Sequence, residues 1–458
     1  MKLRVPHTYV LLFILLLLAA ASTHFIPAGA FERIQIKDRQ IVAPDSYHRV
    51  DSKSANVIDV FTAFPKGLLE VSHIVFYIFI VGGAFGVIAA TGAIDAGIHA
   101  LVRTLGKFQS AVVPVLTCAF AIGGGTFGMA EETLPFLPAL VLLSRSLGYD
   151  SLTGGAIALV GANAGFAGAF LNPFTVGVAQ GIAGLPLFSG WEFRVGVWAT
   201  LTFATVLYVS HSAGRVKRAP ESSPVFLLDQ QSVSSLSASH TKLQTRHVLV
   251  LILFVLTFLV LILGAMKWEW GINELAALFF AFAILVGPVG GLSLNLTAEK
   301  FIEGAASLTG GALVVGLARA TLVVLSEAQV IDTIMLALAN LVRELPAQVS
   351  VIGIYVAQVL LSIIVPSGGG QAAISIPLLA PLSDLLGVTR QTMVLAYQFG
   401  DGFTNILTPT QGYFMAGLAL LGIPWNVWVR WLLPLFTIWL VLGLVALFTA
   451  HAIALGPF

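Results

Sequence analysis

Three acidic side chains stand inside stretches that are otherwise apolar enough to lie in a membrane. Glu131 and Glu132 follow a glycine cluster, and Asp401 lies in the segment 400–405. A carboxylate in a membrane-spanning segment costs about 2.5–3.5 kcal/mol on insertion scales, so it persists only with a partner or a function. The expected chemistry is the binding of a coupling ion or of a positively charged substrate group. Two plainer interpretations stay open: Asp401 as an N-cap at a helix break, and one of the two glutamates held by backbone donors.

The acids lie beside helix breaks, and the pattern of breaks occurs twice. The first copy runs from the glycines 123–125 to Pro173, and the second from the glycines 368–370 to Pro409. Breaks at membrane depth are tolerated only where they line a cavity or are buried in protein. Their free N–H groups suit a carboxylate, and their free carbonyls suit a cation. The predicted substrate-binding residues are Gly124, Gly125, Thr126, Asn172, Ser367, Gly368, Gly369, Gln371, Thr404 and Thr408. The predicted ion-coupling residues are Glu131, Glu132, Asn163, Asp401 and Asn405, with Thr175 and Thr410 as further hydroxyls nearby.

Glycine clusters in apolar helices have a second interpretation, which is close helix packing. That interpretation is favoured for Gly82-Gly83 and for Gly154-Gly155, whereas the polar neighbours of the two tips favour a binding site. The one basic residue expected deep in a span is Arg319. It would either neutralise one of the acids or contact a substrate carboxylate. The core near the tips is otherwise expected to hold three acids and no Lys or Arg.

Composition places the chain in a membrane. Of its 458 residues, 57% are hydrophobic and only 10% are charged, and the mean hydropathy is +0.94; soluble domains carry about 25% charged residues. The net charge of +1 argues against a nucleic-acid partner. A lone cysteine, Cys118, excludes an intrachain disulfide. Because no G-x-x-x-x-G-K-[ST] motif, metal cluster or Ser/His/Asp grouping stands out, neither ATP, a cofactor nor an enzymatic activity is expected.

The elements that must position these residues follow from the apolar runs. The run 9–25 is either a cleaved signal peptide or, as the many later spans favour, an uncleaved first helix with a cytoplasmic N-terminus. Residues 31–42 predict a β-hairpin within an outside loop, 28–65. After a span at 71–91, the residues 94–105 predict an amphipathic surface helix, with Asp95 and its counterpart Asp332 as caps.

A re-entrant hairpin and a broken helix are predicted next. Residues 109–147 form the hairpin with its tip at the glycines, and its arms of about 14 and 20 residues include one too short to span a bilayer. Residues 152–184 form a helix broken between Asn163 and Pro173, and 191–209 cross back. The basic, Ser- and Gln-rich segment 211–247 is expected to be a cytoplasmic linker.

The second half then repeats the first. Gly123 matches Gly368, 245 residues later, and Pro173 matches Pro409, 236 residues later, which indicates an internal repeat. Counting crossings makes the repeat inverted, with about nine crossings and an outside C-terminus. The predicted fold is an all-α polytopic membrane protein. Its domains are a first repeat at 1–210, the linker at 211–247, and a linking helix with the second repeat at 248–458. Residues 109–186 and 349–424 would form a transport domain, and the rest a scaffold.

Five stretches (6–10, 26–29, 91–95, 123–132 and 400–410) resemble the YfcC-type family of the anaerobic dicarboxylate carrier group, within the ion transporter superfamily. The resemblance implies a homodimer of inverted repeats in a bacterial inner membrane, with a mobile domain that moves like an elevator. It also implies that substrate and sodium bind at 123–126, 367–371, 163–175 and 401–410. The tips here are Gly-Gly-Gly-Thr and Ser-Gly-Gly-Gly-Gln, which depart from the Ser-Asn-Thr signature of some relatives and argue against a simple dicarboxylate assignment.

The sequence therefore predicts a secondary active transporter of small carboxylate-bearing metabolites, coupled to Na⁺ or H⁺. Acids without nearby cations favour a ligand with its own positive charge, so amino acids are favoured, including basic ones moved by antiport. A four-carbon dicarboxylate carrier is the alternative. A channel is the second alternative, because channels also use re-entrant hairpins, and an intramembrane enzyme is a distant third.

Overall fold

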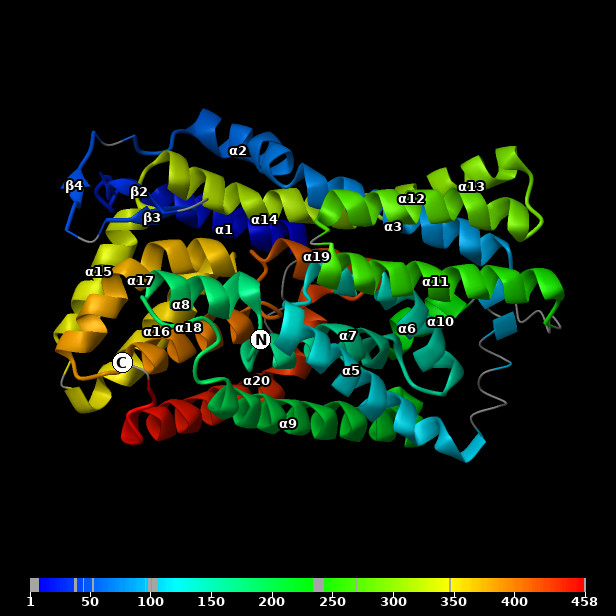
Figure 1. The fold of residues 1–458 in the computed structure, drawn as a ribbon. Coiled ribbons are helices and arrows are strands. Elements are labelled where there is room, and N and C mark those ends of the chain that lie inside the picture. The colour runs from blue at the N-terminus through cyan, green and yellow to red at the C-terminus, as the bar shows by residue number, and fades with distance from the viewer. Residues whose placement is uncertain are drawn as a thin grey trace.

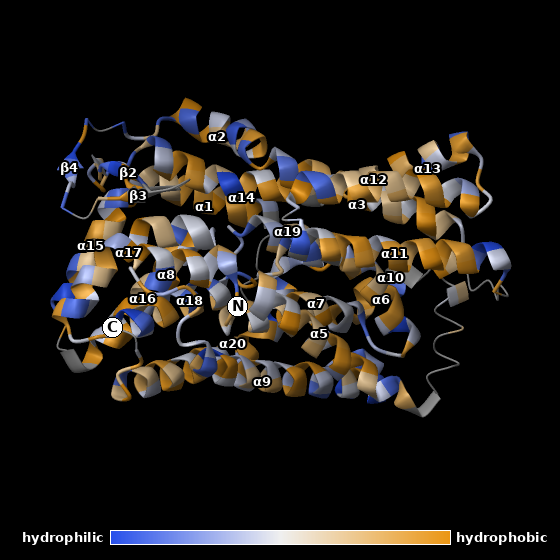
Figure 2. Ribbon diagram, in the orientation of Figure 1, coloured by the Kyte–Doolittle hydropathy of each residue, from blue (hydrophilic) through white to orange (hydrophobic). Residues whose placement is uncertain are grey.

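The chain is almost entirely helical in the computed structural model (Figure 1). The structure describes residues 8–36, 39–43, 45–51, 53–94, 96–97, 100, 106–233, 243–268, 270–345 and 347–456. The helices run mostly side by side along one long axis, and the strands gather at one end. Hydrophilic residues collect around those strands, whereas α11 (Thr245–Lys267) and α12 (Ile272–Val289) are hydrophobic over most of their length (Figure 2). The all-α class predicted from the sequence is confirmed.

The predicted N-terminal hairpin is present. After α1 (Thr8–Ser22), β2 (Arg33–Ile36) pairs antiparallel with β3 (Arg39–Val42), and β1 (Gly29–Ala30) pairs with β4 (His48–Arg49). Asp332 is not the predicted cap. It is the second residue of α15 (Ile331–Arg343), and its carboxylate accepts hydrogen bonds of 2.9 Å from the Phe31 N–H and from the Arg33 guanidinium. It therefore ties the hairpin to α15. Asp95 and most of the predicted surface helix at 94–105 lie outside the described residues.

An upper layer in Figure 1 contains the helices that flank the predicted hairpins. At Gly86, α3 (Ser72–Ala90) crosses α13 (Leu294–Ser307) so closely that an added Cβ would lie 2.5 Å from the Lys300 carbonyl oxygen. An added Cβ on Gly82 would lie 2.9 Å from the Gly304 carbonyl oxygen. The packing interpretation of Gly82-Gly83 is thus confirmed. The layer contains α1, α2 (Val57–Glu70), α3, α12, α13 and α14 (Thr309–Glu327).

The two halves of the chain then present the same order of elements. Each has a hairpin, a helix that ends at a break, a short helix and a long final helix. In Figure 1 the first hairpin lies in the right half and the second in the left half. The first set is α5 (Val112–Phe127), η2 (Glu131–Thr133), α6 (Phe136–Ser146), α7 (Ser151–Ala167), η3 (Pro173–Gly177), α8 (Val178–Ile182) and α9 (Trp191–Arg218). The second set is α16 (Ala347–Ile364), α17 (Gly368–Leu385), α18 (Arg390–Thr404), α19 (Gly412–Leu421) and α20 (Trp425–Ala452).

The first hairpin differs from the prediction in where it turns. The glycines 123–125 lie inside α5, and the helix ends at Gly128, whose φ of 73° is left-handed. The glycines serve a helix crossing, because an added Cβ on Gly124 would lie 2.0 Å from the Ala162 carbonyl oxygen of α7. The predicted arm lengths are consequently wrong: the first arm is the long one, a 20-residue run over Phe108–Phe127, and α6 has 11 residues.

Fewer helices are long and apolar enough to span a membrane than the nine crossings expected from the sequence. In the part of the chain that the structure describes, five helices are long and apolar enough to span a membrane, or six if the pair Leu294–Ser307 and Ala312–Glu327, bent by 42°, counts as one span. Other apolar helices, α6 and α19 among them, are shorter. Several of the nine expected crossings are therefore short or broken helices rather than full spans.

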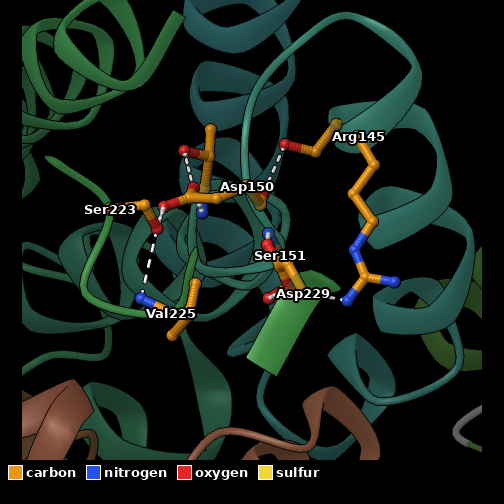
Figure 3. Close-up of polar contacts among 8 residues, drawn as sticks. Arg145, Asp150, Ser151, Ser223, Val225 and Asp229 are labelled. Atoms are coloured by element: carbon orange, nitrogen blue, oxygen red, sulfur yellow. Dashed lines mark hydrogen bonds and ion pairs between the residues drawn. The ribbon is translucent and has the colours of Figure 1, made fainter. Parts of the chain in front are cut away.

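The predicted linker is only partly a linker. The helix α9 continues to Arg218, and α10 (Phe226–Val233) docks on the turn between α6 and α7 (Figure 3). Asp229 of α10 accepts hydrogen bonds from the Arg145 guanidinium at 2.6 Å and from the Ser151 N–H at 2.9 Å. The N-cap of α7, Asp150, likewise accepts a bond of 2.6 Å from the Ser223 hydroxyl. Residues 223–229 are thus fixed to the base of the first hairpin.

This docking predicts the effect of Asp229→Ala. Hydrogen bonds to a charged group contribute about 1.5–3 kcal/mol each, and the variant leaves Arg145 and the Ser151 N–H without their acceptor. We expect amide hydrogen exchange in residues 226–233 to become at least about tenfold faster, since about 1.4 kcal/mol is already a factor of ten. Glu221→Ala, an exposed acid of the same segment, is the control. Equal exchange in the two variants would show that α10 docks without Asp229.

Candidate functional site

The second hairpin tip meets the first break. An added Cβ on Gly368, the first residue of α17, would lie 2.7 Å from Cγ2 of Thr175 and 2.8 Å from Oδ2 of Asp401. The adjacent Gly369 approaches the Phe174 carbonyl oxygen. The Ser367 hydroxyl caps the helix by accepting the Gly370 N–H at 3.3 Å, and the Tyr397 hydroxyl fixes the tip by donating to the Gly368 carbonyl at 2.6 Å. A helix N-terminus, a threonine and a carboxylate thus meet at one point.

Asp401 is fully buried at this point, and neither of its oxygens has a hydrogen-bond partner in the described structure. Asn405, one turn further on, lies close enough to influence the carboxylate. Asp401 lies within α18, one turn before its end, so it caps no helix start at the break and the N-cap interpretation is wrong. Thr175 Oγ1 and Asn172 Nδ2 are also buried without a partner. Unsatisfied buried polar atoms cost about 1–3 kcal/mol each, so this group points to an ion or ligand that completes it.

The first tip reaches the same break from the other side. The Gly125 carbonyl accepts the N–H groups of Phe170 and Leu171 at 3.1 and 3.2 Å. An added Cβ on Gly128 would lie 2.6 Å from Oδ1 of Asn172, and that oxygen accepts the Phe174 N–H at 2.9 Å. The contacts therefore join the two tips through residues 170–175.

The two glutamates have different environments. The Glu132 carboxylate accepts the Ala130 N–H at 2.9 Å, so it is the one held by a backbone donor. Both glutamates are half-buried and act electrostatically on Tyr77 of α3. Together with Asp401 they also act on Tyr413 of α19. The three predicted acids thus face one region of the core.

The tyrosines of this region were not predicted from the sequence. The Tyr413 hydroxyl lies 2.9 Å from Nδ2 of Asn163, which places Asn163 inside α7 beside the acids rather than at the break. Tyr77 is fully buried, and its hydroxyl has no partner in the described structure. The only available signal was a single tyrosine within each apolar helix.

The environments of the two glutamates predict unequal effects of Glu131→Gln and Glu132→Gln. The amide oxygen of glutamine at position 132 can still accept the Ala130 N–H, so we expect that variant to retain most uptake. We expect Glu131→Gln to lose more uptake at unchanged protein level, because no other residue of the described structure donates a hydrogen bond to the Glu131 carboxylate. Uptake per amount of protein reconstituted in liposomes measures both. A larger loss in Glu132→Gln would reverse these assignments.

The other predicted polar residues are already engaged. Gln371 donates to the Gln358 carbonyl at 3.0 Å, and Thr404 donates to the Ser362 hydroxyl at 2.7 Å; both bonds tie α16 to its neighbours. Thr408 pairs with Thr410 at 2.8 Å, and Thr126 donates to Ile122 of its own helix. At the second break, the Asn405 side chain accepts from Gln411, and the carbonyls of Ile406 and Leu407 accept the indoles of Trp428 and Trp425. The side chain of Asn405 and the carbonyls of Ile406 and Leu407 at the second break thus have partners, whereas Asn172 Nδ2 and Thr175 Oγ1 at the first break have none in the described structure.

The basic residues differ most from expectation. Arg319 pairs with Glu70 of α2 at 2.6 Å, so neither expected role is found. Arg194 of α9 is instead the buried cation: it is 1% exposed, and its three guanidinium nitrogens have no partner in the described structure. The expectation of a core without Lys or Arg is therefore wrong. The sequence concealed Arg194 because an arginine at the start of a span normally reaches out to the membrane surface.

Buried carboxylates beside helix breaks and hairpin tips, within an apolar bundle, define a multi-pass membrane transporter. The chain belongs to the C4-dicarboxylate anaerobic carrier family, whose model (DcuC) matches residues 5–452. The family predicted from the sequence motifs is confirmed.

Two relatives match over almost their whole length. The chain is 33% identical over 469 residues to the Escherichia coli (strain K12) protein named "Putative basic amino acid antiporter YfcC", covering 93% of this chain and 92% of that protein. It is 29% identical over 489 residues to an uncharacterized protein of Haemophilus influenzae, covering 96% of each.

Two solved transporters are similar over their full length at a TM-score of 0.42. The YdaH transporter of Alcanivorax borkumensis is 18% identical, with 99% of this chain and 100% of that chain covered. MtrF of Neisseria gonorrhoeae, from a class of antimetabolite efflux pumps, is 17% identical, with 97% and 95% covered.

Proposed function

We propose that the protein is a secondary active transporter of amino acids, basic ones included, that works by antiport and is coupled to Na⁺ or H⁺. The observation that carries the proposal is Asp401, a buried carboxylate without a hydrogen-bond partner that faces Thr175 and the N-terminus of α17. An unpaired carboxylate in an apolar core is unfavourable. A cation that enters the site, or a proton, removes that cost, and this is what coupled transport requires.

The surroundings of Asp401 support a substrate with charges of both signs. Glu131, Glu132 and Asp401 act on one region, and Arg319 is paired elsewhere, so an amino group or a cationic side chain would be stabilised there. The N-terminus of α17 offers backbone N–H groups that suit a carboxylate. The name of the Escherichia coli relative agrees with this choice. The family description favours a second candidate, a four-carbon dicarboxylate.

The same proposal includes the architecture. Residues 109–186 and 349–424 would form a transport domain that moves against the remaining scaffold, in a homodimer in the bacterial inner membrane. The N-terminus would be cytoplasmic and the C-terminus outside. The shared order of elements in the two halves, and hairpins that lie in opposite halves of the molecule, support an inverted repeat. Tyr77, from outside the transport domain, lies within electrostatic range of the acids of the first hairpin, so movement would change their surroundings.

Counterflow in proteoliposomes tests the proposal. Liposomes loaded with unlabelled lysine, arginine, neutral amino acids or four-carbon dicarboxylates are diluted into labelled substrate, with Na⁺ and pH gradients set separately. We expect accumulation with amino acids, greatest for the basic ones, and none in protein-free liposomes. Accumulation with dicarboxylates alone would establish the second candidate. Flux that simply follows the gradient, without counterflow, would indicate a channel.

A further inference from the structure

Arg194 is a buried charge that the contacts described above do not use. It lies in the first turn of α9, on the face that also buries Val197 and Leu201. Its side chain is 1% exposed, and no ion pair or hydrogen bond of its guanidinium occurs in the described structure. Burying a charge without a partner is strongly unfavourable. The guanidinium therefore requires an anionic or polar group that binds it during the working cycle.

The position of Arg194 is next to the first break. One turn further along α9, Trp198 packs on residues of the break: an added Cβ on Gly168 would lie 2.6 Å from the Trp198 Cα, and the ring of Trp198 contacts that of Phe170 at 5.7 Å. One turn earlier, Gly190 lies beside the Gln391 side chain of α18. Arg194 is thus on the stretch of α9 between the break and α18, the helix that carries Asp401.

The same part of the core holds acceptors that are also unsatisfied. Gln398 of α18 donates its amide to the Phe166 carbonyl at 2.6 Å, but its Oε1 has no partner, and both oxygens of Asp401 lack one. Arg194 and Asp401 do not pair with each other within 4.0 Å. Arg194, through its neighbour Trp198, and Asp401, through Gly368 and Thr175, thus flank the segment 168–175 from α9 and from α18, and neither has a partner in the described structure. A ligand with charges of both signs that binds along this segment would satisfy both.

We propose that Arg194 receives the carboxylate of the substrate while Asp401 receives its cationic group. The inference rests on the proposed function and adds the residue that selects for a free carboxylate. A guanidinium suits this role because its planar set of N–H donors matches a carboxylate in a bidentate pair. The structural alternative is that Arg194 neutralises the C-terminal end of α7. That role would place the Ala164–Ala167 carbonyls within hydrogen-bond distance of the guanidinium, and none of its nitrogens has such a bond.

The test compares each transported amino acid with its carboxamide and with the amine that lacks the carboxyl group, as competitors of labelled uptake. The wild-type protein should prefer the free acid. Arg194→Gln should raise KM for the free acid by about tenfold or more and remove the preference, because the loss of one partner of a buried charge pair is costly. Arg194→Lys should retain part of it. Arg319→Gln, which removes an arginine paired with Glu70, is the matched control and should keep the full preference.

Three outcomes would overturn the assignment. Arg194→Gln that folds and keeps the wild-type ratio of free acid to carboxamide shows a structural arginine. If the variant does not fold, the wild-type protein decides: the free acid should raise its thermal midpoint and the carboxamide should not, and equal protection by both refutes the role. If no amino acid supports counterflow by the wild-type protein, the proposed function itself fails and this inference falls with it.

Discussion

The variant Asp401→Asn should fold, reach the membrane and lose most of its transport. The substitution keeps the volume of the side chain and one acceptor oxygen, but it removes the negative charge and the ability to exchange a proton for a cation. We expect uptake below about a tenth of the wild-type value, because about 1.4 kcal/mol of lost binding is already a factor of ten. We also expect the remaining uptake to lose its pH dependence, since an amide does not titrate. Uptake in proteoliposomes over a range of pH measures both effects.

The matched control is Asp384→Asn in α17, the hairpin arm that precedes α18. Asp384 is exposed and pairs with Arg390 at 2.7 Å, away from the break, so its loss should be close to neutral. Wild-type behaviour of Asp401→Asn would refute the functional role of Asp401. If Asp401→Asn retained wild-type uptake and an unchanged pH profile, the carboxylate would only stabilise the N-terminus of α17, a structural effect of about 0.3–1 kcal/mol.

The breaks and acids were predictable from the sequence because their physical cost is local. A proline, a glycine cluster or a carboxylate inside an apolar segment is unfavourable in a membrane whatever surrounds it. For that reason the sequence alone identified Asp401, the segment that contains Asn172, and the second tip at Gly368, and the structure brings these three together.

The first tip was misplaced because glycine has two uses that the sequence does not distinguish. At Gly128 it permits a left-handed turn, whereas at Gly124 it permits a helix to approach. Only the partner helix reveals which use applies. The same limit explains why Arg194 and Tyr413 were not predicted, because the surroundings of each depend on elements far away in the sequence. The docking of Asp229 on Arg145 was hidden for another reason, because a polar composition indicates exposure and not where a segment binds.

The crossing of α5 and α7 is the packing feature most sensitive to a single added atom. Gly165 of α7 lies so close to α5 that a Cβ there would be 1.9 Å from the Ala121 carbonyl oxygen, and Gly124 makes the reciprocal contact with Ala162. Small residues about one turn apart on crossing helices allow backbones this close together. Because the obstructing atom belongs to the backbone, a side-chain rotation cannot relieve the clash, and the first hairpin would have to move away from α7.

We therefore expect Gly165→Ala to destabilise the protein by about 3 kcal/mol or more, at or above the usual range for overpacking. The expression level of folded protein and its thermal midpoint in detergent should both fall. Gly196→Ala is the control, because an added Cβ there meets nothing within 4 Å. That variant should be neutral or slightly stabilising, since alanine favours a helix over glycine by about 1 kcal/mol. The same substitution thus has opposite signs at two helical positions of one chain. Equal stability of the two variants would mean that α5 and α7 do not cross at Gly165, and the position of the first hairpin would then have to be revised.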